Sequence, residues 1–444
     1  MKDFQEFIKG KKITVMGLGL LGRGLGDIKF LAENGVDIIV TDLKTKEELS
    51  SSIKELEHFS NITFVLGEHR IEDFENADLV LRAPNAPLDS PYLKAAENKR
   101  VHITQSTALF AKFVKREQLI GITGTRGKST TTQLISHVLK TAGKEVITGG
   151  NVQGISTLSL LPTVTENSLI VLELDSWQLQ SFGTEKLSPH VAVFTTFMKD
   201  HMNYYKGDVD RYLLDKAQIF LNQTSGDHLV LGEDIYEIVT STYKDQIRAE
   251  IHVGKREPVS SDLQERLPGK HNALNIACAI EVLKLYGLEI GQIENGIKSF
   301  EGVPGRLEYL GDKNGIRIYN DTTATTPDAA IAALEALDMG NKNIVLIAGG
   351  SDKELEMDNF VREAIQKTKK TILLSGTGTD KIKMYFENSP IVNSLEEALK
   401  EAFSVAEKGD TILLSPAFAS FGMFKNEYDR GDQFKNLIKV MPTD

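Results

Sequence analysis

Short apolar runs alternate with amphipathic helical patterns along the whole chain, and this alternation restricts the possible folds more than any other feature. The apolar runs include KITVMGL, VDIIVTD, ADLVLRA, QLIGITG, SLIVLEL, VAVFTTF, IRIYND, NIVLIAGG, KTILLSG and DTILLSPA. Continuous apolar runs are typical of strands that are buried on both faces of a parallel sheet and covered by helices. The sequence therefore predicts an α/β fold.

The length of the chain, 444 residues, exceeds what one hydrophobic core normally supports and predicts about three domains. Candidate joints lie near residues 110–118 and in EGVPGRLEYL, where glycine and proline break a helical pattern. We expect domains at 1–112, 113–303 and 304–444.

Composition excludes several classes of protein. The net charge of −11 argues against a protein that coats nucleic acid, and it leaves anionic ligands to a few placed cations and helix ends. No apolar run is long enough to span a bilayer, and no secretory signal opens the chain. The single cysteine, Cys278, cannot form an internal disulfide, which indicates a reducing compartment. We expect a cytoplasmic protein.

The stretch MGLGLLGRG contains the pattern G-x-G-x-x-G at Gly17, Gly19 and Gly22, directly after an apolar run. Asp42 ends the next apolar run, 25 residues after Gly17. This arrangement is typical of a dinucleotide site, where glycines let backbone N–H groups approach a pyrophosphate at a helix N-terminus. Taken alone, the motif predicts an NAD-dependent oxidoreductase.

A second glycine-rich loop, GITGTRGKSTTT, lies between a strand-like run and an amphipathic helical pattern. In such a P-loop the backbone N–H groups hold phosphates, Lys128 reaches the terminal ones and the Ser129 hydroxyl can bind Mg²⁺. The strict pattern requires glycine where Ile122 stands. The alternative is a chance glycine-rich turn.

Further along the chain, three residues could bind a metal ion or a phosphate. Glu173 ends an apolar run, where open α/β sheets place their ligands, although a strand-end carboxylate can also cap a neighbouring element. His201 follows another such run, and a lone histidine is more often a packed or surface residue. Lys216 lies on the buried stripe of a helical pattern, where it either extends to water or carries a modification or meets a phosphate.

Several motifs together resemble the Mur ligase family of ATP-dependent, amide-forming enzymes of peptidoglycan precursor synthesis. The likeness covers essentially the whole chain, in the order TGTRGKST, GGN, ELDSWQL, DHMNYY, DKAQIF, GKHNALN, GVPGRLEY, NDTTATTPDA, AGGSDK and LLSPAFASFGMFKNEYDRGDQF. The last motif is similar to that of the members that add D-glutamate to UDP-N-acetylmuramoyl-L-alanine.

The resemblance implies a Rossmann-like N-terminal domain, a central P-loop ATPase-type α/β domain and a C-terminal Rossmann-like α/β domain. The first domain then binds the UDP part of the substrate instead of NAD, with Leu20 and Leu21 beside the diphosphate and Asp42 beside the uridine. The central domain binds ATP, and the third domain supplies the amino acid. The expected partners are these small molecules, bound by a monomer.

The resemblance also implies roles for individual residues. Lys128 would stabilise the transferring phosphoryl group, Ser129 and Glu173 would hold one Mg²⁺, and His201 would hold a second Mg²⁺ near a carbamylated Lys216. Lys128, His201 and Lys216 are thus the expected catalytic residues. The expected nucleotide-binding residues are Gly124, Thr125, Arg126, Gly127, Lys128, Ser129, Thr130, Asn272, Asn275, Arg306 and Asp321. The expected substrate-binding residues also include Asn151 for the muramoyl part and Thr325, Lys353 and Ser420 for the amino acid.

The implied reaction activates a carboxylate. ATP converts it to an acyl phosphate, with Mg²⁺ and Lys128 screening the approach of two anions, and the amine of glutamate then displaces phosphate. Closure of the domains would exclude water from the acyl phosphate.

The chain departs from the usual family pattern at Asp175, Gly305, Thr323, Glu427 and the segment RAPN at 82–85. Thr323 removes a cation and Glu427 adds an anion on the amino-acid side, which leaves the identity of the amino acid open. The alternatives are a related Mur-type ligase for another amino acid, such as L-glutamate, a folylpolyglutamate-synthase-like or cyanophycin-type enzyme, and a non-catalytic nucleotide-binding partner protein.

Overall fold

The computed structural model describes residues 1–18, 22–87, 89–152, 154–257 and 267–441. The chain divides into two compact units. The first unit contains residues 1–255 and 274–296, and the second unit contains residues 256–273 and 297–444.

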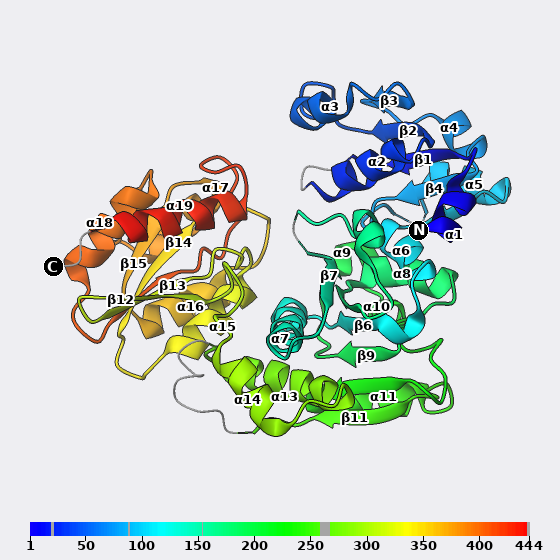
Figure 1. The fold of residues 1–444 in the computed structure, drawn as a ribbon. Helices are drawn as coiled ribbons and strands as arrows, with labels where there is room; N and C mark the ends of the chain where they lie inside the picture. The colour runs from blue at the N-terminus through cyan, green and yellow to red at the C-terminus, as the bar shows by residue number, and fades with distance from the viewer. Residues whose placement is uncertain (19–21, 88, 153, 258–266, 442–444) are drawn as a thin grey trace. The chain divides into compact units, whose positions relative to one another are not determined.

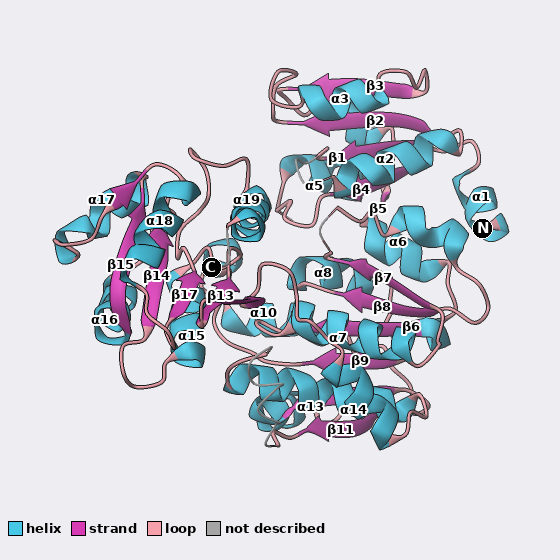
Figure 2. Ribbon diagram, turned by 60° about the vertical axis from the view of Figure 1, so that its left-hand side comes forward, coloured by secondary structure: helices cyan, strands magenta, loops and turns pink. Residues whose placement is uncertain are grey.

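The first unit begins with a five-stranded parallel sheet in the order β3-β2-β1-β4-β5 (Figures 1 and 2). Its strands are β1 (Lys12–Met16), β2 (Asp37–Asp42), β3 (Ile62–Leu66), β4 (Leu79–Arg82) and β5 (His102–Thr104). Its helices are α1 (Lys2–Ile8), α2 (Arg23–Glu33), α3 (Ser50–Leu56), α4 (Ile71–Glu75), α5 (Pro91–Asn98) and α6 (Ser106–Lys112). The strand order reverses beside β1, which is the point where open parallel sheets bind ligands.

A six-stranded parallel sheet follows in the order β11-β10-β9-β6-β8-β7. Its strands are β6 (Leu119–Thr123), β7 (Val146–Gly150), β8 (Leu169–Glu173), β9 (Val191–Phe194), β10 (His228–Gly232) and β11 (Glu250–Gly254). The accompanying helices are η1 (Arg116–Gln118), α7 (Lys128–Thr141), η2 (Leu158–Thr163), α8 (Ser176–Thr184), α9 (Met202–Tyr205), α10 (Val209–Ala217), η3 (Glu233–Ile235), α11 (Tyr236–Tyr243), α13 (Lys270–Leu285) and α14 (Ile290–Lys298). Helices flank the strands of this sheet (Figure 2).

One continuous hydrophobic core joins these two sheets. Phe4 and Phe110 of the N-terminal part belong to the same buried cluster as Leu172 and Phe182 of the central part. Because burial of apolar surface is the main stabilising contribution to folding, this shared core makes the two parts one compact unit.

The second unit is built on a six-stranded sheet in the order β12-β13-β17-β14-β15-β16, parallel except for the β12–β13 hairpin. Its strands are β12 (Glu308–Lys313), β13 (Ile316–Asn320), β14 (Ile344–Gly349), β15 (Thr368–Leu374), β16 (Ile391–Val392) and β17 (Thr411–Leu414). Its helices are α15 (Pro327–Leu337), α16 (Asp358–Lys367), α17 (Thr377–Ile382), η4 (Lys383–Tyr385), α18 (Leu395–Val405) and α19 (Glu427–Val440).

Strand β14 shows why an uninterrupted apolar run forms a strand here. Ile344 and Leu346 belong to a buried cluster with residues of α15 and α16, whereas Val345 and Ile347 belong to a cluster with residues of α18 and α19. Both faces of the strand are therefore covered. The predicted α/β fold on largely parallel sheets is confirmed. Among the described residues, no helix has the length and apolarity needed to cross a membrane.

Candidate active site

The central sheet gathers the candidate residues at one edge. The second glycine loop leaves the carboxyl end of β6, Asn151 follows β7, Glu173 ends β8, and residues 195–201 follow β9. These strands are parallel neighbours, so their carboxyl ends meet at the same edge of the sheet.

At two positions of the second glycine loop there is no space for any residue other than glycine. Gly124 and Gly127 have φ angles of 151° and 89°. A Cβ atom on Gly124 would lie 2.0 Å from Thr195 Oγ1, and one on Gly127 would lie 2.2 Å from Asn275 Oδ1. Asn275, an expected nucleotide residue, therefore packs against the loop.

Helix α7 begins at Lys128, directly after this loop, which places Ser129 and Thr130 in its first turn. The side chains of both residues are half-buried. The first N–H groups of a helix lack intrahelical partners and favour anions. The loop and helix together form a suitable phosphate cradle.

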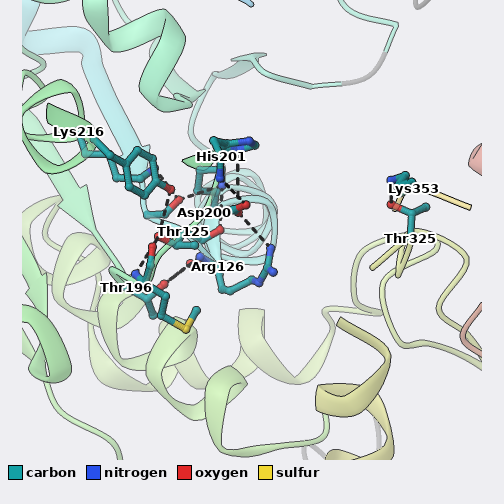
Figure 3. Close-up of polar contacts among 12 residues, drawn as sticks. Thr125, Arg126, Thr196, Asp200, His201, Lys216, Thr325 and Lys353 are labelled. Atoms are coloured by element: carbon teal, nitrogen blue, oxygen red, sulfur yellow. Dashed lines mark hydrogen bonds and ion pairs between the residues drawn. The ribbon is translucent and has the colours of Figure 1, made fainter. Parts of the chain in front are cut away.

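Residues 195–198 hold the loop in place (Figure 3). The N–H of Thr125 donates to the carbonyl of Thr196 at 2.8 Å, and the N–H of Arg126 donates to Thr196 Oγ1 at 2.9 Å. Thr195 Oγ1 donates to the carbonyl of Arg126 at 2.6 Å. Sequence reasoning missed these threonines, although two hydroxyl groups directly after an apolar run were a usable signal.

Lys128 and Lys216 converge on this loop. Their Nζ atoms donate to the carbonyl oxygen of Gly124 at 2.9 and 3.0 Å respectively. Helix α10 directs Lys216 inward, where the side chain is 2% exposed and its Nζ lies 4.9 Å from the ring centroid of Tyr212. Burial, and then the charge of Lys128, lower the pKa of Lys216 well below its ordinary value. This environment favours the neutral, nucleophilic amine.

His201 lies at the start of α9 with a left-handed backbone, φ 56°. Its ring centroid is 4.5 Å from that of Trp177, and its Nε2 is 3.8 Å from Asp200 Oδ2. Burial lowers the pKa of His201. The charge of Asp200 raises this pKa, and the charge of Lys216 lowers it further. The neutral imidazole is the form that binds metal ions. Asp200 also lies 3.6 Å from Arg126 Nη1.

Glu173 is a buried carboxylate with little hydrogen bonding. Its side chain is 4% exposed, and within the described part of the chain the only hydrogen bond to its carboxylate comes from Asn151 Nδ2 at 3.4 Å. The Oδ1 of Asn151 accepts a hydrogen bond from Arg23 Nη1, at the start of α2. A buried carboxylate normally needs a cation or several donors, so this site fits a hard divalent ion. Sequence reasoning missed Arg23.

The first glycine loop is organised by Asp42. Its Oδ2 accepts from the N–H of Leu18 and its Oδ1 accepts from the N–H of Lys44, both at 2.9 Å. Asp42 therefore ties the loop to the end of β2. Leu20 and Leu21, the expected diphosphate neighbours, lie outside the described residues.

The second unit brings the three expected amino-acid residues into one region. Lys353 Nζ donates to Thr325 Oγ1 at 2.8 Å (Figure 3). Backbone hydrogen bonds of 2.9 and 3.1 Å pair Ser351 with Ala419. Lys353 comes two residues after Ser351, and Ser420 comes directly after Ala419. The Ser420 side chain is buried, and its hydroxyl has no hydrogen-bond partner among the described residues. Burial lowers the pKa of Lys353, while Glu427 opposes this shift.

The expected third-domain nucleotide residues differ in exposure. Arg306 is exposed, whereas both Asp321 oxygens accept hydrogen bonds, from the N–H of Leu307 at 3.0 Å and from Ser415 Oγ at 2.8 Å. Burial raises the pKa of Asp321 to about 7. Asn272 is buried in the second unit and donates to the carbonyl of Pro268 at 2.9 Å.

The residues that depart from the usual family pattern form hydrogen bonds within the structure. Asp175 caps α8 by accepting from the N–H of Gln178 at 2.7 Å, as a serine would. Thr323 Oγ1 donates to the carbonyl of Gly305 at 2.9 Å, so two departures contact each other. Arg82 is buried and donates to Gln180 Oε1 at 2.8 Å.

Comparisons with known proteins identify the relatives of this chain. Residues 11–105 match the family described as Mur ligase MurD-like, N-terminal domain, residues 122–265 the Mur ligase middle domain, and residues 305–418 the Mur ligase, glutamate ligase domain. A UDP-N-acetylmuramoylalanine–D-glutamate ligase of Roseiflexus sp. (strain RS-1) is 36% identical, over 97% of this chain and 99% of the relative.

Solved structures show the same fold. The UDP-N-acetylmuramate–alanine ligase MurC of Thermotoga maritima has a TM-score of 0.58 at 21% identity, over 97% of this chain and 99% of that chain. The MurF ligase of Thermotoga maritima in complex with ADP has a TM-score of 0.56 at 17% identity, over 91% and 96% of the two chains.

Proposed function

Because the chain belongs to the Mur ligase family, we propose that it joins D-glutamate to UDP-N-acetylmuramoyl-L-alanine in peptidoglycan precursor synthesis. The reaction uses ATP and releases ADP and phosphate. The D-glutamate ligase that is 36% identical over nearly the full length supports this choice of substrates. The observation that carries the proposed chemistry is the convergence of Lys128 and Lys216 on the carbonyl of Gly124 in a phosphate loop.

The proposed chemistry requires a carboxylate to become an acyl donor. Its negative charge repels the γ-phosphate of ATP, and Lys128 reduces this repulsion at the phosphate loop. Transfer of the phosphoryl group gives an acyl phosphate and ADP. The amine of D-glutamate then attacks the acyl carbon, loses a proton, and phosphate leaves as the amide forms.

We propose two metal positions. Glu173 and Ser129 would hold one Mg²⁺, and His201 with a carbamylated Lys216 would hold the second. Bound Mg²⁺ neutralises phosphate charge. The amine of Lys216 adds to CO₂, forms an N–C bond and releases one proton, which leaves an anionic carbamate. The low-pKa environment of Lys216 supports this step because only the neutral amine adds to CO₂.

The substrates are assigned to the loops and side chains described above. The first glycine loop, with Asp42, holds the uridine diphosphate, and Asn151 meets the muramoyl part. The second unit binds glutamate through Thr325, Lys353 and Ser420. Arg306 and Asp321 are the proposed nucleotide residues of the second unit, where Asp321 also accepts a hydrogen bond from the N–H of Leu307, next to Arg306. We further propose a cytoplasmic monomer with domains at 1–112, 113–303 and 304–444.

The test is phosphate release by the purified full-length chain with ATP and Mg²⁺. Release should require both UDP-N-acetylmuramoyl-L-alanine and D-glutamate. A higher kcat/KM for L-glutamate would overturn the amino-acid assignment and keep the reaction class. Binding of ATP without phosphate release under any pairing would favour a non-catalytic binding protein. The match of residues 11–105 to a MurD-like N-terminal domain argues against the alternative of an NAD-dependent oxidoreductase.

A further inference from the structure

A cluster of two histidines and a glutamate lies on adjacent strands, away from the candidate active site. His228 begins β10, and Glu250 begins β11, which also contains His252. The strand register pairs His228 with Glu250 and Val230 with His252, so these side chains share one face of the sheet.

The three side chains direct their ligand atoms toward one point. His228 Nδ1 lies 3.1 Å from His252 Nε2 and 3.5 Å from Glu250 Oε2, and His252 Nε2 lies 3.9 Å from Glu250 Oε2. A tetrahedral ion with bonds of about 2.0–2.1 Å separates its ligand atoms by about 3.3–3.4 Å. The observed separations span this value.

We propose that His228, Glu250 and His252 bind one divalent ion of the zinc class. Two imidazole nitrogens and one carboxylate oxygen are a common zinc ligand set, whereas Mg²⁺ and Ca²⁺ prefer oxygen ligands alone. The Glu250 side chain is 66% exposed, so the site opens to solvent and water takes the fourth position.

Neighbouring side chains support the histidine ligands. The ring centroid of His190 is 5.4 Å from that of His228. His190 is itself held by Asp227, whose Oδ1 lies 2.9 Å from His190 Nδ1 and whose side chain is 1% exposed. The His190 ring, held by Asp227, therefore limits the orientations that the neighbouring His228 ring can adopt.

The position of the cluster separates it from the ATP chemistry. His228 and Glu250 begin their strands, whereas the phosphate loop leaves the carboxyl end of a parallel strand in the same sheet. The ion would instead join β11, the edge strand of the sheet, to β10. Unpaired edge strands are weak points of sheets, so a cross-strand ion would stabilise this edge.

The experiment measures Zn²⁺ binding to the full chain, freed of metal by a chelator and kept in millimolar Mg²⁺ to occupy oxygen-rich sites. Equilibrium dialysis should find one tightly bound Zn²⁺. His252→Ala and Glu250→Gln should each weaken this binding at least about tenfold, and the exposed His58→Ala should leave it unchanged. Bound Zn²⁺ should raise the melting temperature by at least about 3 °C in the wild type and not in His252→Ala.

Three further measurements separate loss of the metal site from loss of the fold. Circular dichroism of His252→Ala, and a second variant His252→Gln, separate loss of ligand from loss of fold. Co²⁺ should give the intense absorption of a four-coordinate ion in the wild type and lose it in both variants. Phosphate release should change less than twofold in these variants. Equal Zn²⁺ affinity in the wild type and in all folded variants would overturn the proposal.

Discussion

The amines of Lys128 and Lys216 donate to one acceptor, the carbonyl oxygen of Gly124, from residues that are 88 positions apart in the chain. Lys128 also donates to the carbonyl of Thr125 at 3.3 Å, whereas Lys216 is almost completely buried, and both burial and the charge of Lys128 disfavour its ammonium form. The arrangement therefore favours an uncharged Lys216, or one converted to an anion.

Lys216→Arg should lower kcat by at least about a hundredfold, because arginine retains a cation but cannot carry a carbamate. Labelling with ¹³C-bicarbonate should give a carbamate signal in the NMR spectrum of the wild type and none in Lys216→Arg. Activity of the wild type should fall as pH falls through the pKa of Lys216, since protonation reverses carbamate formation. Lys140→Arg, an exposed change on α7, is the matched control. A wild-type spectrum without the signal would remove the modification from the mechanism.

Arg126→Ala should raise the KM for ATP about tenfold and change kcat less. The exposed Arg126 guanidinium stands in the phosphate loop and lies 3.6 Å from Asp200, so it adds positive charge where the net charge of the chain opposes ATP. Arg248→Ala removes an exposed arginine elsewhere in the first unit and should leave this KM unchanged. If both variants bind ATP equally well, Arg126 has no role at the nucleotide.

Lys353→Met should raise the KM for D-glutamate at least about tenfold while the KM for ATP changes less than twofold, because a cation is lost from the proposed glutamate site. Glu427→Gln should lower the KM for D-glutamate severalfold, because an anion that opposes the substrate is removed. Lys400→Met, on the exposed side of α18, serves as the control. An unchanged KM for glutamate in Lys353→Met would place the amino acid elsewhere.

Asp321→Asn should change the pH dependence of stability. Burial raises the pKa of Asp321 to about 7, so the folded state binds this proton more tightly than the unfolded state does. The free energy of unfolding of the wild type therefore falls as pH rises from about 4 to about 7, and the asparagine variant lacks this loss. Urea unfolding should show the difference between variant and wild type moving in favour of the variant by on the order of 2–3 kcal/mol from pH 5 to pH 8. Asp312→Asn, an exposed change, should show no such trend; if Asp321→Asn behaves in the same way, Asp321 is not protonated by burial.

The sequence predicted what local pattern determines. Uninterrupted apolar runs correctly predicted parallel strands such as β14, because both of its faces are buried. The pattern around Gly124 and Gly127 correctly predicted a tight turn between a strand and a helix. The odd position of Lys216 on an apolar stripe also signalled burial.

Contacts between distant segments were beyond such patterns. Thr196 supports Arg126 across 70 residues, and Arg23 meets Asn151 across 128 residues. No period or spacing encodes these pairs, because they depend on which strand ends become neighbours. The contact between Thr323 and Gly305 is of the same kind, because nothing in the sequence shows that these two departures from the family pattern are hydrogen-bond partners.

The side chains of Arg23, Asn151 and Glu173 form a hydrogen-bonded chain that links the two sheets of the first unit. Arg23 stands at the exit of the first glycine loop, and Asn151 connects it to a carboxylate at the edge of the second sheet. A ligand that attracts the Arg23 guanidinium frees the Asn151 amide and so changes the hydrogen bonding of Glu173. The two sheets of the first unit are thus coupled through one amide, because a change at either end of the Asn151 side chain alters the hydrogen bonding at the other end.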